Sequence, residues 1–216
     1  RAEGIEIVEE AAAAEVRGQA GAIEVEVEDG RVFKGSHLLM AVGRNPNLDS
    51  LDLDKAGVET TKAGVKVDDS LKSTNRRVFA IGDVAGGLQF PHVAGYHAGI
   101  VIRSALFGLP AKTSTAHIPW ATYTAPELAQ VGLTEAQARA AHGDRLEVTR
   151  FEFAHSDRLI TERETAGLIK VMVVKGRPVG VSIAGHQAGE LANLWSLVIA
   201  NKLKMKHVAA MASPYP

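Results

Sequence analysis

Cysteine is absent from the 216 residues of this chain. Its absence excludes a disulfide framework, a thiolate metal site and a cysteine nucleophile within these residues. Long apolar runs are missing as well, since none approaches the roughly 20 residues that a helix needs to cross a bilayer. Charge of one sign is not in excess either, because the formal net charge is −1. We therefore expect no membrane and no nucleic acid among the partners and, with no export signal in view, a cytoplasmic protein.

The composition is that of an ordinary globular protein, with 46% hydrophobic and 23% charged residues. The length allows one large domain or two modest ones. Both ends look cut, because the chain opens on "RAEGIEIVEE" without an initiating Met and stops at "MASPYP" directly after a helical stretch. We expect a fragment of a larger protein.

The first 41 residues alternate between apolar and polar side chains, a pattern that is typical of strands. In "AIEVEVEDGRVF" the apolar residues of the first half share one face, and Asp29-Gly30 is a strong hairpin signal. This part of the chain predicts a small antiparallel meander that leads into a buried run over residues 37–42. Farther on, residues 91–107 predict a helix, which the following Gly-Leu-Pro ends.

A second unit is expected from about residue 114, after a linker at residues 108–116. Its first elements are a strand over residues 120–133 and a helix with Thr134 as N-cap and Gly143 as its end. The further elements expected are a strand at 146–155, a hairpin at 167–185 that turns at Lys175-Gly176, and helices at 188–203 and 205–212.

The stretch "VFAIGDVAGG", residues 78–87, raises the first functional question. Its apolar start predicts a strand buried on both faces, and Gly82 permits a sharp turn or a close approach. Asp83 then stands at the carboxyl end of that strand, where open α/β sheets bind their ligands. Its carboxylate can accept hydrogen bonds from sugar-type hydroxyls. The alternative is an ordinary turn aspartate that caps the next segment.

Four motifs in order resemble one family: "AVGRNPN", "STNRRVFAIGDVAGG", "YTAPELAQVGLTE" and "AGHQAGELANLW". Together they resemble the C-terminal half of the FAD-dependent pyridine nucleotide-disulfide oxidoreductases, which include dihydrolipoamide dehydrogenase, glutathione reductase and mercuric reductase. The fold implied is α/β and α+β, a partial FAD/NAD(P)-binding Rossmann-like region followed by an α+β dimerisation domain. The implied domains are the end of the NAD(P)-binding domain at 1–43, the end of the FAD-binding domain at 44–113, and an incomplete dimerisation domain at 114–216.

The resemblance also implies the cofactors FAD and NAD(P)H, a homodimer, and a small-molecule electron acceptor. In such proteins the glycine-rich phosphate loops and the redox-active cysteine pair precede these motifs. We therefore expect the 216 residues alone to lack the nucleophile and part of each cofactor pocket. A rival hypothesis is a non-catalytic fragment that retains only self-association.

The same resemblance assigns candidate site residues. Asp83 matches the aspartate that binds FAD through its ribityl chain, and backbone N–H groups at the start of the helix at 91–107 would face the flavin carbonyl edge. Gly43 matches a position against the nicotinamide nucleotide, where a side chain would block close approach. Arg44 either pairs with a carboxylate or phosphate there or lies solvated in an Asn-Pro turn. The full set expected at FAD is Asp83, Val84, Gln89, His92, Val93 and Ala94.

Several histidines and aromatic residues leave alternatives open. His92 and His97 are five apart on one helix, which is poor spacing for metal ligands. We expect His92 to contact flavin through its backbone and His97 to serve packing or lie at the surface. Trp120, Tyr123 and Trp195 suit either an interface or the core.

Tyr215 is the most informative departure from the family pattern. Thiol-exchanging members carry His-Pro where this chain has Tyr215-Pro216, and that histidine is the base for the substrate thiol across the dimer. An unperturbed tyrosine has a pKa of about 10 and a histidine one of about 6.5, so tyrosine is a poor proton acceptor at neutral pH. Mercuric-reductase-like members can carry Tyr in this stretch. We therefore favour mercuric-reductase-like chemistry over dihydrolipoamide oxidation, which stays the alternative.

Overall fold

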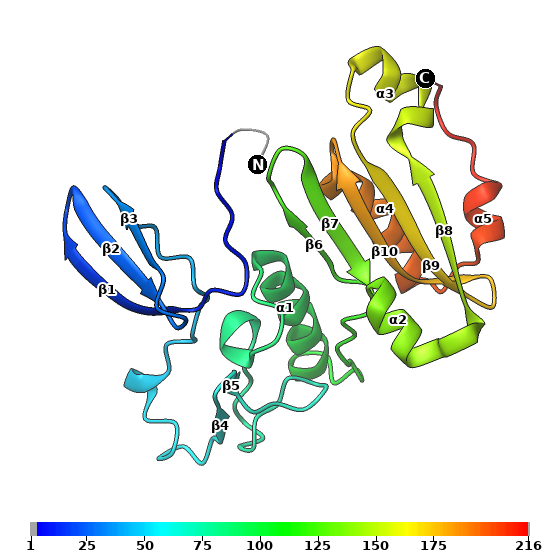
Figure 1. Cartoon of the computed structure of the whole chain (residues 1–216). Helices are drawn as coiled ribbons and strands as arrows, with labels where there is room; N and C mark the ends of the chain where they lie inside the picture. The colour runs from blue at the N-terminus through cyan, green and yellow to red at the C-terminus, as the bar shows by residue number, and fades with distance from the viewer. Residues whose placement is uncertain (1–3, 216) are drawn as a thin grey trace. The chain divides into compact units, whose positions relative to one another are not determined.

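The computed structural model describes residues 4–215, which fall into two compact units that meet between Asn45 and Pro46 (Figure 1). The first unit is the predicted meander: β1 (Ala13–Gln19), β2 (Ala22–Val27) and β3 (Val32–Gly35) pair antiparallel in that order. Val25 of β2 lies opposite Val16 and Phe33 in the register, so the apolar residues share a face as expected. Asp29-Gly30 lies in the turn between β2 and β3, which confirms the hairpin signal.

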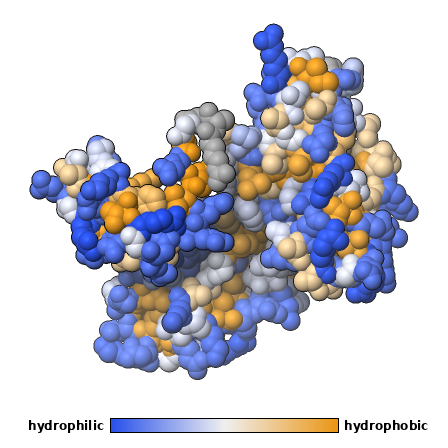
Figure 2. All heavy atoms as spheres, in the orientation of Figure 1, coloured by the Kyte–Doolittle hydropathy of each residue, from blue (hydrophilic) through white to orange (hydrophobic). Residues whose placement is uncertain are grey.

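The buried run predicted over residues 37–42 is wrong. Leu39 is 88% exposed and Val42 84%, and the segment pairs with none of the described strands of its unit. An apolar pattern shows that a segment can be buried, but burial requires a neighbouring element that covers it. Val16 and Val32 are also exposed, and Figure 2 shows apolar side chains among the charged ones on this unit.

The second unit begins with short elements around a small core of Val58, Val65 and Ala80. A strand buried on both faces was expected at residues 78–81, and that prediction is wrong. The segment makes only an isolated bridge, from Phe79 to Lys72, and Ile81 is 37% exposed. An extended segment becomes a strand only by pairing. The elements here are η1 (Asp49–Leu51), β4 (Thr60–Thr61), β5 (Gly64–Val65), η2 (Gly82–Ala85) and α1 (Pro91–Ala105).

The rest of this unit is built on a five-stranded antiparallel sheet of order β6-β7-β10-β9-β8. The single strand expected at residues 120–133 is a pair of strands, β6 and β7, joined by a turn. The hairpin β9–β10 turns at Lys175-Gly176 as predicted. The strands are β6 (Pro119–Thr122), β7 (Glu127–Gly132), β8 (Leu146–Glu152), β9 (Leu168–Val174) and β10 (Arg177–Gly185).

Helices cover both faces of this sheet. On β9, Val171 belongs to the core under α4, whereas its neighbour Lys170 pairs with Glu135 of α2; alternation along the strand therefore places α4 and α2 on opposite faces. The predicted N-cap Thr134 and end Gly143 of α2 are confirmed. The helical elements are α2 (Glu135–His142), η3 (Gly143–Arg145), η4 (Phe153–His155), α3 (Asp157–Glu162), α4 (Ala188–Ala200) and α5 (Met205–Ala209).

The fold is thus mixed α/β, as expected. In residues 4–215 no helix is both long and apolar enough to span a membrane. The three-domain division that the family resemblance implies stays a prediction.

Candidate functional site

The Gly82–Asp83 turn is held against helix α1. Gly82 is buried and has a φ of 63°, in the left-handed region that favours glycine. A Cβ added to Gly82 would lie 2.9 Å from the Cβ of Ala94. Only glycine therefore lets η2 pack this closely on α1, and the backbone just before Asp83 has little room to move.

A buried histidine completes this contact. The backbone N–H of Gly82 donates to Nδ1 of His97, with 3.1 Å between the two nitrogens. Because Nδ1 is the acceptor, it carries no proton, and the ring is neutral. Burial lowers the pKa of His97, which favours the same neutral form. His97 is only 7% exposed, so of the two alternatives expected for it, packing or a place at the surface, the structure supports packing; its hydrogen bond was not foreseen.

The other side of η2 packs on the turn between β4 and β5. Gly64, the first residue of β5, follows this turn, and a Cβ on it would clash with the carbonyl oxygen of Val84. The Val84 side chain itself packs against the core of Val58, Val65 and Ala80. Asp83, between Gly82 and Val84, is half-buried. The turn thus presents a carboxylate from a backbone that is packed on two sides.

At the start of α1, two of the backbone N–H groups expected to face the flavin are already hydrogen-bonded within the chain. The N–H groups of Val93 and Ala94 already donate to the carbonyl oxygen of Phe90, at 3.0 and 3.2 Å. They are engaged because Phe90 is the N-cap residue, whose carbonyl accepts the first bonds of the helix. Pro91 has no N–H, so His92 has the remaining amide of this turn among the described residues.

The His92 side chain contacts two residues outside the helix interior. Its Nε2 lies 2.8 Å from the carbonyl oxygen of Pro119, and its ring stacks on Phe90 at 5.3 Å between centroids. The imidazole is thereby directed to the start of β6. The contact of His92 with flavin through its backbone stays a prediction. Gln89, the residue before Phe90, is half-buried.

The remaining predicted residues lie elsewhere. Gly43 and Arg44 are exposed at the end of the first unit, and Gly43 has a φ of 109°, which also favours glycine. Tyr215 is 81% exposed, and its hydroxyl donates to Oδ2 of Asp157 at 3.0 Å. Figure 1 shows that this end of the chain lies beside α3 and away from η2 and α1. The structure therefore gathers the FAD candidates around η2 and α1 but does not bring Tyr215 to them.

Helix α4 carries exposed leucines beside its buried face. Its inner face packs on the sheet through a buried row that includes Ala192, Trp195 and Val198. Beside this buried row, Leu191, Leu194 and Leu197 form an exposed leucine face; they are 39%, 37% and 59% exposed and three residues apart. Large apolar side chains that gather on an exposed surface usually mark an interaction site, so this leucine face is a candidate interface.

The aromatic alternatives are now resolved in part. Trp195 is a core residue at 8% exposure, whereas Tyr123 is 80% exposed. Trp120 is half-buried on β6. Within residues 4–215 no cluster of three or more His, Asp or Glu side chains could hold a metal ion.

Comparison with known families agrees with these features. The sequence model described as pyridine nucleotide-disulphide oxidoreductase matches residues 1–98, and the one described as the dimerisation domain of the same family matches residues 118–216. Dihydrolipoyl dehydrogenase of Bacillus subtilis is 36% identical over 160 residues, covering 73% of this chain and 34% of that protein. Mercuric reductase of Lysinibacillus sphaericus is 35% identical over 205 residues, covering 93% of this chain and 37% of that protein.

Solved structures give the same fold. LpdA of Mycobacterium tuberculosis matches the whole chain with a TM-score of 0.91 at 24% identity, over 48% of its own length. The Cu(II) complex of the HOCl-induced flavoprotein disulfide reductase RclA of Escherichia coli also matches the whole chain, with a TM-score of 0.88, 26% identity and 49% of its length. The chain thus spans about half the length of these two structures, and about a third of the two relatives.

Proposed function

The chain belongs to the pyridine nucleotide-disulphide oxidoreductase family, whose members are enzymes that use FAD and NAD(P)H, and from that premise we propose that it provides flavin contacts and a self-association surface for such an enzyme. The observation that carries the proposal is the packed Gly82–Asp83 turn at the start of α1. The reaction proposed is electron transfer from NAD(P)H, by way of FAD, to a small-molecule acceptor.

The residues of the turn suit FAD chemically. FAD, when bound, supplies the redox chemistry that side chains cannot perform. Asp83 offers a carboxylate that accepts hydrogen bonds from the hydroxyls of the ribityl chain. The His92 amide and the positive end of the α1 dipole favour negative charge near the start of the helix. Val93 and Ala94, whose amides are already bonded, contribute shape, and Val84 and Gln89 complete the set of residues assigned to FAD.

Two further roles belong to the proposal. Gly43 and Arg44 are assigned to the nucleotide end of the cofactor sites, on the family resemblance alone. The leucine face of α4 is assigned to a second copy of the chain, because the matching family segment is a dimerisation domain. The covering of an apolar helix face by an identical face is the usual arrangement in twofold dimers.

For the acceptor we favour a metal ion, in the manner of a mercuric reductase, over a dithiol. The support is Tyr215, whose hydroxyl donates to Asp157 and which stands where thiol-exchanging members have a histidine base. The relatives include both mercuric reductases and dihydrolipoyl dehydrogenases, so dihydrolipoamide oxidation is the second candidate. Rates of NADH and NADPH oxidation with Hg(II), and of NAD⁺ reduction with dihydrolipoamide, decide between them.

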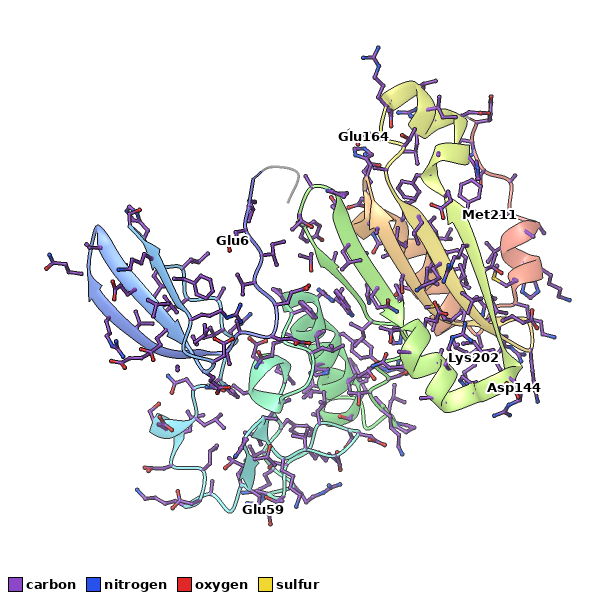
Figure 3. All side chains as sticks on the ribbon, viewed as in Figure 1. Glu6, Glu59, Asp144, Glu164, Lys202 and Met211 are labelled. Carbon is purple, nitrogen blue, oxygen red and sulfur yellow. The ribbon has the colours of Figure 1, made fainter. Side chains whose placement is uncertain are left out.

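Replacement of Asp83 tests the flavin site. In the protein that contains this chain, Asp83→Ala should lose one or two charged hydrogen bonds, each worth roughly 1.5–3 kcal/mol. Flavin absorbance per protomer after gel filtration should fall accordingly. A matched control is Asp144→Ala, because Asp144 also follows a glycine in a 3-10 helix but is exposed at the junction of α2 and β8 (Figure 3). Unchanged flavin content and affinity in the Asp83 variant would contradict the assignment.

A further inference from the structure

His97 occupies a position where the helix would ordinarily carry an apolar residue. The buried residues of α1 are Val93, His97 and Ile100, which follow one another at i, i+4 and i+7 on a single face. They are 2%, 7% and 8% exposed. A polar ring in such a stripe costs free energy unless it is hydrogen-bonded. This ring has a specific partner, the N–H of Gly82.

That partner explains what the ring does. Gly82 is the first residue of η2, and the first N–H groups of a helix have no acceptor within the helix. His97 supplies the missing acceptor from 15 residues farther along the chain. Ala94, one turn before His97 on the same helix, packs so closely against Gly82 that a Cβ on Gly82 would not fit. The two contacts fix the backbone of Gly82, and Asp83 is the next residue.

We propose that His97 is a positioning residue for flavin binding, which holds the Gly82–Asp83 turn in its binding conformation before the cofactor arrives. This inference rests on the proposed role of Asp83. The ligand chemistry is the polyhydroxylated chain of FAD, which needs the carboxylate in one place. A turn that is ordered in advance binds more tightly, because less conformational freedom is lost on binding.

Two substitutions separate this role from simple packing. In His97→Asn the amide oxygen lies two bonds beyond Cβ, as Nδ1 does in histidine, so the acceptor is retained. In His97→Gln it lies three bonds beyond Cβ, in the place of Nε2, and the acceptor for Gly82 is lost. His97→Leu removes the acceptor and keeps an apolar side chain. His142→Leu, on α2, is a control for the loss of a half-buried helical histidine.

The measurements are FAD affinity, from flavin fluorescence, and hydrogen exchange of a peptide that covers residues 78–90, with and without FAD. In the protein that contains this chain we expect His97→Gln and His97→Leu to weaken FAD binding on the order of tenfold, the equivalent of one lost hydrogen bond. The same two variants should exchange faster in this peptide without FAD. His97→Asn and His142→Leu should stay close to wild type in both.

Equal FAD affinity for His97→Asn and His97→Gln would overturn the inference, even if His97→Leu failed to fold. That result would leave the role of Asp83 intact, provided that Asp83→Ala still lost FAD. A wild-type protein that binds no FAD would instead overturn the proposed function, and this inference with it.

Discussion

The hydroxyl of Tyr215 donates a hydrogen bond to the carboxylate of Asp157, with 3.0 Å between the two oxygens. Asp157 begins α3 and lies 58 residues earlier in the chain. The bond ties the segment after α5 to the start of α3. It also uses the hydroxyl as a donor, which is the role that its chemistry favours at neutral pH.

Replacement of Tyr215 by phenylalanine should therefore change turnover little. The bond is solvent-exposed, and its loss is worth about 0.5 kcal/mol, or roughly a twofold effect. Tyr215→His should raise the rate of dihydrolipoamide oxidation, because histidine can accept a proton near pH 7. Steady-state kinetics with dihydrolipoamide and with Hg(II) are the measurements, and Tyr123→Phe, another exposed tyrosine, is the control. Loss of dithiol oxidation in Tyr215→Phe, from a wild type that performs it well, would show that both the role and the favoured acceptor are wrong.

Glu127 caps helix α4 from a distance. The N–H of Gly189, in the first turn of α4, donates to Oε2 of Glu127 on β7 at 2.9 Å, and the N-cap residue Gln187 makes no such bond with its side chain. We expect Glu127→Ala to lower the free energy of unfolding by about 1 kcal/mol, as the loss of a helix cap does. Glu127→Gln, which keeps an acceptor oxygen, should lose less. Urea denaturation of the three proteins checks the order, and an equal loss in both variants would contradict the capping role.

The features that were predicted correctly depend on residues close in sequence. Helix α2 begins where Thr134 and Gln137 bond to each other's backbone N–H groups, three residues apart, and the β9–β10 hairpin turns at adjacent residues. Such local signals act wherever the chain lies. Such features can therefore be predicted without knowing which distant segments pack against them.

The features that were missed depend on partners far away. Residues 37–42 and 78–81 have the apolar character of strands, but among the described residues no ladder forms beside them. The bond from Gly82 to His97 spans 15 residues, and the bond from Gly189 to Glu127 spans 62. One signal for His97 was present: it interrupts an apolar row at helical spacing, and a buried polar residue needs a partner. That this partner is the N–H of Gly82 could be found only in the structure.

Glu135 should make stability depend on acid pH. Its carboxylate is bonded to Lys170 and Arg139, which lower its pKa to about 2. A lowered pKa in the folded state contributes stability above the ordinary pKa of glutamate, about 4.3, and that contribution disappears as the pH falls toward about 2. Glu135→Gln should therefore be less stable than wild type at pH 7, and the two should converge near pH 2.

Thermal melts between pH 7 and pH 2 check this expectation. Glu147→Gln, which removes an exposed carboxylate from β8, is the control and should follow wild type more closely. A constant gap between wild type and Glu135→Gln over the whole range would show that packing, and not the charge of Glu135, sets the difference.

The leucine face of α4 should hold two copies of the chain together. Leu194 lies at its centre, between Leu191 and Leu197, and the adjacent side of the helix is buried through Trp195 and its neighbours. In a twofold interface Leu194→Lys removes one leucine from each copy. At about 1.5–3 kcal/mol for each buried side chain, the dimerisation constant should fall by roughly two to four orders of magnitude.

Sedimentation of the protein that contains this chain measures the effect, with circular dichroism to show that the variant is folded. Leu51→Lys is the control, since Leu51 is also an exposed leucine, at 54%, but lies on η1 and not on α4. A lysine at position 194 should yield monomers at micromolar concentration, because burial of two unpaired ammonium groups against apolar surface is strongly unfavourable. A folded wild type that is monomeric at high micromolar concentration would refute the dimer. A dimer equally stable in wild type and Leu194→Lys would instead place the interface on another surface.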